Sequence, residues 1–562
     1  MKPQRHTLLA VIAAAIATAA MWRHPSALAG SYDWRYFQTA MEAGRRSLVW
    51  FAEVPLYNPW MCGGEPQLAN PQSVVGSPAF LLVALFGVAI GQKLMLLAFV
   101  ALGLDGAYRL SRTLGASAIA SATSSLSFGL CGWIVLHFAI GHVSFFGAAL
   151  IPHLLWAYLR AKEDLRFAMA AGVVLAVILA QGGNSTAAMA GIALSIVAVV
   201  DAIVIRSARP LLVLLSSVAA GLALSAYRLF PAAEFAIVHP RHTTETDHQG
   251  VLELTRSAVT FVTSGRMGGQ RYAIHEYSWR LPILAWPLAV LGLRTLRRSL
   301  VVIALPLFIV GAGIALGDAW PYGPWWLMRH LPVLRDLRVP SRYVLLAALA
   351  VALLVGAGMD RLLAWKKSVA VLALALVFVD VAVYANNVFA TVFASPAPAI
   401  ERGPFYQVKG HYSRMLELVY ANHGVVGCDE EAPLTRAALL DEGPVPQARL
   451  EDPTAGTIRT LHASPNHLEV EVSLTRAATI LFDLNWNEHW HSDVGEVQRW
   501  GPKWPADKDG GRLSVNVPMT EGRVRLHYLP RSFVAGALVT VSSLLALAIM
   551  TLLSYRARRR RS

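Results

Sequence analysis

The sequence predicts a polytopic α-helical membrane protein with a mainly-β domain outside the membrane near its C-terminus. Hydrophobic residues make up 55% of the chain. Only 15% of the residues are charged, whereas a typical soluble domain has about 25%. Apolar runs recur along the sequence, each close to the ~20 residues that cross a bilayer core about 30 Å thick. The net charge of +14 comes from short Lys and Arg clusters between these runs, which is typical of cytoplasmic loops and not of nucleic-acid binding.

The first apolar run covers residues 7–22 and follows a basic start. A short, Ala-rich run of this kind resembles a secretory signal, and Ser26–Ala29 resembles a cleavage site. We favour an uncleaved first helix whose N-terminus lies in the cytoplasm.

With this first helix, we expect about twelve transmembrane helices, each of roughly the length that spans a bilayer. Starting from a cytoplasmic N-terminus, every basic cluster between the spans then falls on the cytoplasmic side, as does the final run Arg556–Arg561. We therefore expect a multi-pass membrane protein with both termini in the cytoplasm. The remaining apolar runs are 92–110, 117–137, 141–160, 166–180, 186–205, 210–230, 281–294, 299–317, 342–361, 368–388 and 532–554.

The run 77–90 is not counted, because an additional span there would invert every later loop. We expect a short helix at this position, either re-entrant or lying flat in the outer leaflet, and covered by protein. The main outer-face loops of the membrane domain 1–388 are then 23–91, 231–280 and 318–341.

Residues 389–531 have the composition of a soluble domain, and the final helix with its basic tail follows at 532–562. Segments 468–474, 512–517 and 523–528 alternate apolar and polar residues with period two, which predicts strands. We expect a small antiparallel β-sandwich near 455–531.

The chain has three cysteines. Cys131 lies in an apolar run and is expected in the core. Cys62 and Cys428 both fall in segments predicted to be outside the cytoplasm, where a disulfide between them is possible. The cysteines and histidines have no zinc-site spacing, so the sequence assigns no metal ligands.

Asp33 is the candidate catalytic residue, since it follows the first helix closely on the outer face. A carboxylate there could act as a general base on an acceptor hydroxyl, or help to hold a divalent cation such as Mg²⁺ or Mn²⁺. The structural alternative is a solvated loop acid or a helix cap. The sequence identifies no other cofactor.

Arginines are the candidate substrate-binding groups on the outer face. Arg338 and Arg342 precede and open the span 342–361, against the positive-inside bias. Guanidinium groups bind phosphate oxygens bidentately, so an anionic lipid phosphate is one explanation; pairing with Asp318 and Asp336 is the other. Arg241 and Arg271 in the long middle loop could assist.

Gln181 and Asn184 interrupt two predicted helices through Gly182-Gly183, and could line a cavity or simply form a tight turn. His239, His242, Asp247 and His248 fit no defined metal site and are more consistent with a polar loop. The segment Asn485–His491 resembles a carbohydrate-stacking patch, although a strand edge with a packed tryptophan explains it better.

Several motifs occur in the order found in the bacterial YfhO-like membrane proteins, whose fold belongs with the GT-C glycosyltransferases, and the chain resembles this family over nearly its whole length. The segments that carry the resemblance are Asp33, Pro55–Pro59, Gly64–Gln72, Gln181–Asn184, Leu337–Tyr343, Gly356–Asp360, the C-terminal β domain and Tyr528–Gly536.

The resemblance implies location in the bacterial inner (plasma) membrane, and transfer of a sugar from a polyprenyl-phosphate donor to a cell-envelope glycan, lipid or protein on its outer face. It also implies that Asp33 is the catalytic base or a metal-associated carboxylate. One alternative is a transporter or flippase of a lipid-linked saccharide, but this predicts polar residues and broken helices in mid-membrane. The other is a non-catalytic envelope assembly protein that binds a partner through the β domain.

Overall fold

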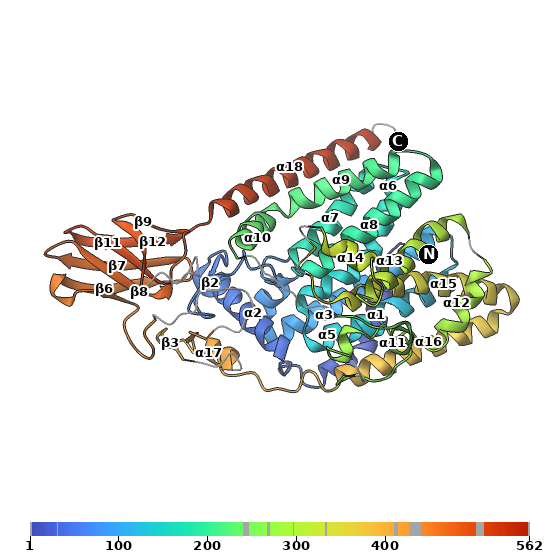
Figure 1. The fold of residues 1–562 in the computed structure, drawn as a ribbon, viewed down its shortest axis with the longest axis horizontal. Coiled ribbons are helices and arrows are strands. Elements are labelled where there is room, and N and C mark those ends of the chain that lie inside the picture. Colours follow the sequence, from blue (N-terminus) through green and yellow to red (C-terminus); the bar gives the residue numbers. More distant parts are fainter. Residues whose placement is uncertain are drawn as a thin grey trace.

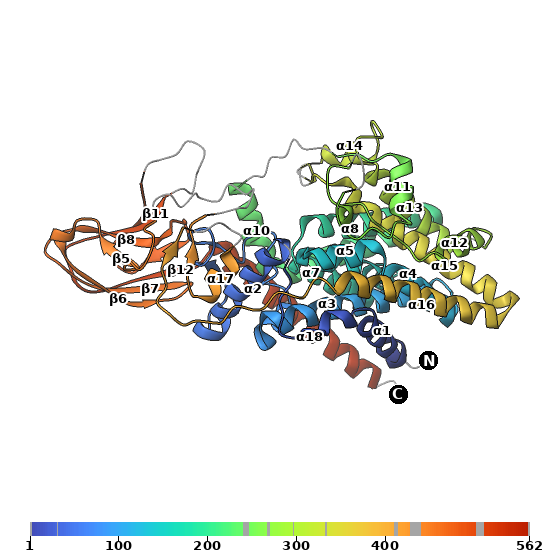
Figure 2. The same ribbon diagram turned by 90° about the horizontal axis from the view of Figure 1, so that it is seen from below.

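The structure is a computed structural model with an elongated helical region and a β domain at one end (Figure 1). It describes residues 3–30, 32–239, 247–266, 270–295, 297–331, 334–335, 337–409, 414–427, 440–501 and 511–559. Helices α1 (Pro3–Ala17) and α18 (Arg531–Arg559) have their terminal ends in the half of the molecule away from the β domain (Figures 1 and 2). We call the helix ends on the β-domain side the outer ends, and those on the side of the termini the inner ends.

Among the described residues, eight helices are long and apolar enough to cross a membrane. Two helical segments that follow one another directly are counted as one span. The eight are α3 (Phe80–Thr113), α4 (Ala118–Gly129) with α5 (Gly132–Ile140), η2 (Val143–Leu150) with α6 (Ile151–Ala161), α8 (Asn184–Ile205), α13 (Arg298–Ala315), η4 (Pro340–Tyr343) with α15 (Val344–Trp365), α16 (Lys367–Phe389) and α18 (Arg531–Arg559).

Each predicted apolar run does contain a helix. Fewer than the expected twelve helices, however, are long and apolar enough to count as spans. The run 210–230 forms α9 (Arg209–Leu224) and α10 (Ala226–Val238), which are bent by 83° and make a ninth span if counted together. The three remaining runs form short helices. The sequence did not predict this, because hydropathy marks an apolar run and does not report where the helix within it ends. They are α1 (Pro3–Ala17), α7 (Arg166–Ala180) and α12 (Ala285–Leu293).

The run 77–90 does not add a span. Helix α3 breaks at Gly87, whose φ of 75° and ψ of 168° favour glycine. A Cβ on Gly91 would lie 2.4 Å from the Cα of Val83, whereas residues eight apart in a straight helix are about 12 Å apart. Residues 80–86 therefore fold back against the following helix.

The β domain contains two four-stranded sheets with the orders β10-β11-β8-β5 and β6-β7-β12-β9. Every strand pair within these two sheets is antiparallel; for example, Val524 pairs with Val470, and Val515 with Ile480. Inward residues of both sheets share one apolar core. The strands are β5 (Ala448–Leu450), β6 (Gly456–Ala463), β7 (His467–Leu474), β8 (Ala478–Asn485), β9 (Trp490–Ser492), β10 (Glu496–Trp500), β11 (Arg512–Val517) and β12 (Glu521–Tyr528).

The first outer loop, residues 23–91, has secondary structure of its own. It contains α2 (Tyr32–Phe51) and the hairpin β1 (Tyr57–Asn58) and β2 (Glu65–Pro66). Cys62 in this loop is disulfide-bonded, and Cys131 is buried and free. Cys428, the possible partner of Cys62 in the sequence, lies outside the described residues.

The loop also joins the two regions of the molecule. Tyr57 belongs to the core of the β domain, where its ring contacts those of Trp490 and Tyr528. Glu53 accepts hydrogen bonds from the Asn466 backbone N–H at 2.9 Å and the Ser464 hydroxyl at 2.5 Å. The β domain is therefore fixed to the first outer loop as well as to the last helix.

Smaller elements complete the fold. They are η1 (Ala19–Trp22), α11 (Val251–Ser257), η3 (Ile274–Glu276), α14 (Pro324–Arg329), β3 (Gln407–Val408), α17 (Met415–Tyr420), β4 (Gly424–Val425) and η6 (Pro453–Ala455).

Candidate functional site

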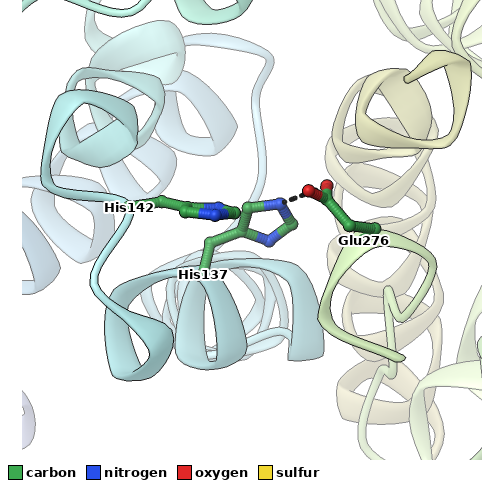
Figure 3. Close-up of side chains that lie close together, drawn as sticks. All are labelled: His137, His142 and Glu276. Atoms are coloured by element: carbon green, nitrogen blue, oxygen red, sulfur yellow. Dashed lines mark ion pairs between the residues drawn. The ribbon is translucent and has the colours of Figure 1, made fainter. Parts of the chain in front are cut away.

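Ionisable side chains from four distant segments meet where the outer ends of the helices converge. Asp33 comes from the first turn of α2, His137 from α5 and His142 from the turn after it. Glu276 ends η3, and Arg342 lies in η4 at the start of α15. We call these five residues the outer cluster. Figure 3 shows that Glu276 approaches the two histidines from a separate part of the fold.

A close contact between α2 and the turn after α5 positions Asp33. The Trp34 indole N–H donates a hydrogen bond of 2.9 Å to the carbonyl oxygen of Ala139. Gly141 has a φ of 105°, and a Cβ there would lie 2.5 Å from the Trp34 backbone nitrogen, so only glycine permits this approach. As a result, His142 Nε2 lies 3.1 Å from Asp33 Oδ2.

The Asp33 side chain is 32% exposed, so a substrate can reach it. Burial alone would raise the pKa of this carboxyl, but the contact with His142, above all its hydrogen bond, holds the pKa below its usual value. Asp33 is therefore ionised at neutral pH.

Arg342 and Glu276 form a buried ion pair with the geometry of a fork. Arg342 Nε donates to Glu276 Oε2 at 2.7 Å, and Nη2 donates to Oε1. Burial alone would raise the pKa of Glu276, but the charge and hydrogen bonds of Arg342 hold it well below its ordinary value. The guanidinium lies 4.7 Å from the centroid of the Phe145 ring and is close enough to Asp33 for their charges to interact.

His137 is completely buried against aromatic rings. Its imidazole stacks on Trp133 with ring centroids 4.1 Å apart, and its Nε2 lies 3.4 Å from Glu276 Oε2. His275 completes the surroundings, with its ring 5.3 Å from that of His142. Burial lowers the pKa of His275 to about 4, so this ring is neutral at physiological pH.

The structure brings together two of the residues predicted from the sequence, Asp33 and Arg342. Arg338 is half-buried in the extended segment before η4. Arg271 is exposed, with its guanidinium 5.6 Å from the centroid of the Tyr272 ring. Arg241 lies outside the described residues.

Gln181 and Asn184 differ in their surroundings. Gln181 is fully buried; its amide donates to the Val143 carbonyl oxygen at 3.0 Å and accepts from the Ser77 hydroxyl at 2.5 Å. Asn184 is exposed at the start of α8. Gln181 thus holds the turn to neighbouring segments, while Asn184 remains accessible.

Two other sequence features do not join the outer cluster. Trp490 is 2% exposed inside the β domain, as expected for a strand edge with a packed tryptophan rather than a carbohydrate-stacking surface. The His239 ring packs on Phe235, and His248 pairs with Gly317 in an isolated bridge. His242 lies outside the described residues.

Sequence analysis missed His137, His142, His275 and Glu276 as site residues. The sequence did contain a signal: two histidines flank one turn between spans, and a His-Glu pair lies in an outer loop. One ring nitrogen of His137, one of His142 and a carboxylate oxygen of Glu276 lie within 4.8 Å of one another, which is a spacing suited to a metal ion. Among the described residues, the only other such group is Glu234, Glu488 and His489.

The chain matches no protein-family model, and no curated protein matches its sequence. Solved structures do match. One is the arabinofuranosyltransferase AftD from Mycobacteria, with 15% sequence identity and a TM-score of 0.50 over 74% of this chain. The match covers 31% of AftD, so this chain corresponds to less than a third of that protein.

Two further matches have lower TM-scores. ArnT from Cupriavidus metallidurans, bound to undecaprenyl phosphate, is 14% identical with a TM-score of 0.44, and the match covers 77% of this chain and 87% of ArnT. The Archaeoglobus fulgidus oligosaccharyltransferase, tethered to an acceptor peptide, is 12% identical with a TM-score of 0.44 and coverages of 77% and 65%. At such low identity the likeness concerns the fold, and the fold of this chain is that of the GT-C glycosyltransferases.

Proposed function

We propose that this chain is a membrane glycosyltransferase that moves a sugar from a polyprenyl-phosphate donor to a cell-envelope acceptor on the outer face. One observation carries the proposal: an accessible, ionised carboxylate, Asp33, lies within electrostatic range of the Arg342 guanidinium at the convergence of the outer helix ends. A transfer of this kind needs a base for the acceptor and a cation for the leaving phosphate.

In the proposed reaction the acceptor hydroxyl oxygen attacks the anomeric carbon of the donor sugar. The bond from that carbon to the phosphate oxygen breaks, and the polyprenyl phosphate leaves with the electron pair. Asp33 takes the hydroxyl proton, and Arg342 stabilises the negative charge that develops on the phosphate. A single displacement inverts the configuration at the anomeric carbon.

Further cations assist with the donor phosphate in this proposal. Arg338 lies four residues before Arg342, and Arg271 lies four residues before His275. Arg241 has the same role by sequence alone. Asn184, which is exposed, contributes a hydrogen bond to the donor or the acceptor, and Gln181 supports the turn that presents it.

The proposal also places both termini in the cytoplasm and the outer cluster on the opposite membrane face. Alternation of the spans supports this placement, because α18 returns the chain from the β domain to the end where α1 begins (Figure 1).

The test is complementation of a deletion strain with Asp33→Asn, followed by mass spectrometry of the cell-envelope glycans. We expect one glycan modification to disappear in the deletion strain and to remain absent with Asp33→Asn at a normal membrane level. Asp318→Asn is the matched control, since Asp318 is an exposed acid of another outer loop; it should restore the modification. A normal glycan profile with Asp33→Asn would contradict the proposal and favour transport or assembly.

A further inference from the structure

The hydrogen bonds of His137 determine where its proton lies. His137 Nδ1 is 3.0 Å from the carbonyl oxygen of Trp133. A carbonyl oxygen only accepts hydrogen bonds, so Nδ1 carries the proton and donates it. In the neutral ring, Nε2 then presents a lone pair, and this atom faces Glu276 Oε2 at 3.4 Å. A nitrogen lone pair and a carboxylate oxygen at this distance repel each other, unless a positive charge lies between them.

His142 has a similar arrangement with a different acceptor. Its Nε2 lies 3.1 Å from Asp33 Oδ2, and an ionised carboxylate also only accepts. A proton on Nε2 leaves a lone pair on Nδ1. Within the described part of the chain, His142 Nδ1 and His137 Nε2 are both buried without a hydrogen-bond partner.

This pattern is typical of histidines that bind a metal. A ligating imidazole nearly always donates its other ring N–H to a carboxylate or a backbone carbonyl, which fixes the tautomer and the ring orientation. His142 uses Asp33 for this purpose, and His137 uses the Trp133 carbonyl oxygen. Stacking on Trp133 further fixes the plane of the His137 ring.

The distances and charges of the outer cluster suit a cation. Tetrahedral ligands at 2.0–2.1 Å from zinc lie about 3.4 Å apart, which is the separation of His137 Nε2 and Glu276 Oε2. The carboxylates of Asp33 and Glu276 outnumber the single guanidinium of Arg342. The side chains that face the ligand atoms therefore favour a cation electrostatically.

We propose that His137, His142 and Glu276 bind a divalent transition-metal ion of the Zn²⁺ class. Two imidazoles and one carboxylate suit zinc, whereas Mg²⁺ requires an octahedron of oxygen ligands. Asp33 and Arg342 are positioning residues for this site: Asp33 orients His142, and Arg342 holds the Glu276 carboxylate. Three protein ligands leave a fourth position of a tetrahedral ion for an oxygen of a substrate or water.

The test is zinc binding by the full-length chain, purified in detergent without a histidine tag. The protein is stripped with a chelator and titrated with Zn²⁺ alone, and bound metal is measured by elemental mass spectrometry. We expect one zinc per chain, and X-ray absorption should show two imidazole ligands at about 2.0–2.1 Å. Mg²⁺ at the same concentration should not compete.

Matched variants separate the ligands from other histidines. His142→Asn should lose the zinc, whereas His153→Asn, beside Asp105 in the helical region, and His489→Gln in the second acid–histidine group should keep it. Asp33→Asn leaves all three ligands in place and should weaken zinc binding about 10- to 100-fold; this variant decides the matter if His142→Asn does not fold. A wild-type chain without zinc, stoichiometric zinc in His142→Asn, or unchanged affinity in Asp33→Asn would overturn the inference.

Zinc binding itself does not depend on the proposed glycosyl transfer, but a contact between the ion and the donor phosphate does. The two proposals therefore fail separately. A chain that transfers sugar but binds no zinc contradicts only the metal site, and a chain that binds zinc with an unaltered glycan profile in Asp33→Asn contradicts only the transferase.

Discussion

The helical region contains two clusters of acids, histidines and arginines, one at each end of the helices, and they are built differently. At the inner ends, Asp105 of α3 accepts from the Thr7 hydroxyl at 2.8 Å and from Arg109, and it contacts the His153 and His6 imidazoles at 3.1 and 3.3 Å. We call these five residues the inner cluster. The outer cluster has two carboxylates, two imidazoles and one guanidinium instead.

Solvent access and the number of carboxylates distinguish the two. In the inner cluster the single carboxylate of Asp105 is 5% exposed, accepts hydrogen bonds from Thr7 of α1 and Arg109 of α3, and contacts His153 of α6. This arrangement ties α1, α3 and α6 together. In the outer cluster the carboxylates of Asp33 and Glu276 share the charge of one guanidinium, and Asp33 is 32% exposed. Among the described residues each cluster has two buried imidazole nitrogens without a hydrogen-bond partner, so residue types and unpartnered nitrogens alone do not reveal a reactive site; the balance of charges and solvent access also decide it.

The largest difference should appear when the central acid of each cluster loses its charge. Asp33→Asn should reduce sugar transfer about 10²- to 10⁴-fold, because the base is lost, while thermal stability stays close to that of the wild type. Transfer per folded molecule in purified, reconstituted protein measures the effect. Equal losses of transfer in Asp33→Asn and Asp105→Asn would remove the distinction between the clusters.

Replacing the arginine of each cluster should give the next largest effect. Arg342→Lys keeps the charge but loses the fork that grips Glu276 and the donor phosphate, so we expect a loss of transfer of roughly 10- to 100-fold. Arg109→Lys is the matched change in the inner cluster and should leave transfer within about twofold of the wild type. Initial rates at saturating donor provide the comparison, and a similar rate for both variants would count against a specific role for Arg342.

The inner cluster should control stability instead. Asp105→Asn weakens the ion pair with Arg109 and the contacts with His6 and His153, and should cost about 1–3 kcal/mol of unfolding free energy. The thermal midpoint in detergent should fall, while transfer per folded molecule stays unchanged. If the midpoint stays the same, the inner cluster does not hold the three helices together.

The smallest effect should come from replacing Asn184, an exposed residue that is not a member of the outer cluster. Asn184→Ala removes one exposed hydrogen-bonding group, and the net value of one hydrogen bond is about 0.5–1.5 kcal/mol. We expect KM for one substrate to rise about 2- to 5-fold with kcat unchanged, because the contact is equally strong in ground and transition states. Steady-state kinetics measure this, and a fall in kcat would instead place Asn184 in the catalytic step.

Sequence reasoning was most successful where structure follows from local periodicity. Apolar runs became helices, and the alternating segments 468–474, 512–517 and 523–528 became β7, β11 and β12. It was less successful with the number of spans, because hydropathy counts apolar residues and does not register the 83° bend between α9 and α10. It also did not anticipate that Tyr57, far away in the chain, completes the core of the β domain.

The sequence by itself determined that the chain is a helical membrane protein with a β domain, and it singled out Asp33 and Arg342. Only the tertiary structure decided that His137, His142 and Glu276 join them. The physical reason is that these residues are separated by more than a hundred positions in places, and no periodicity relates them. Their meeting depends on helix packing, including the close approach of Gly141 to Trp34, and such contacts between distant segments leave no local pattern in a single sequence.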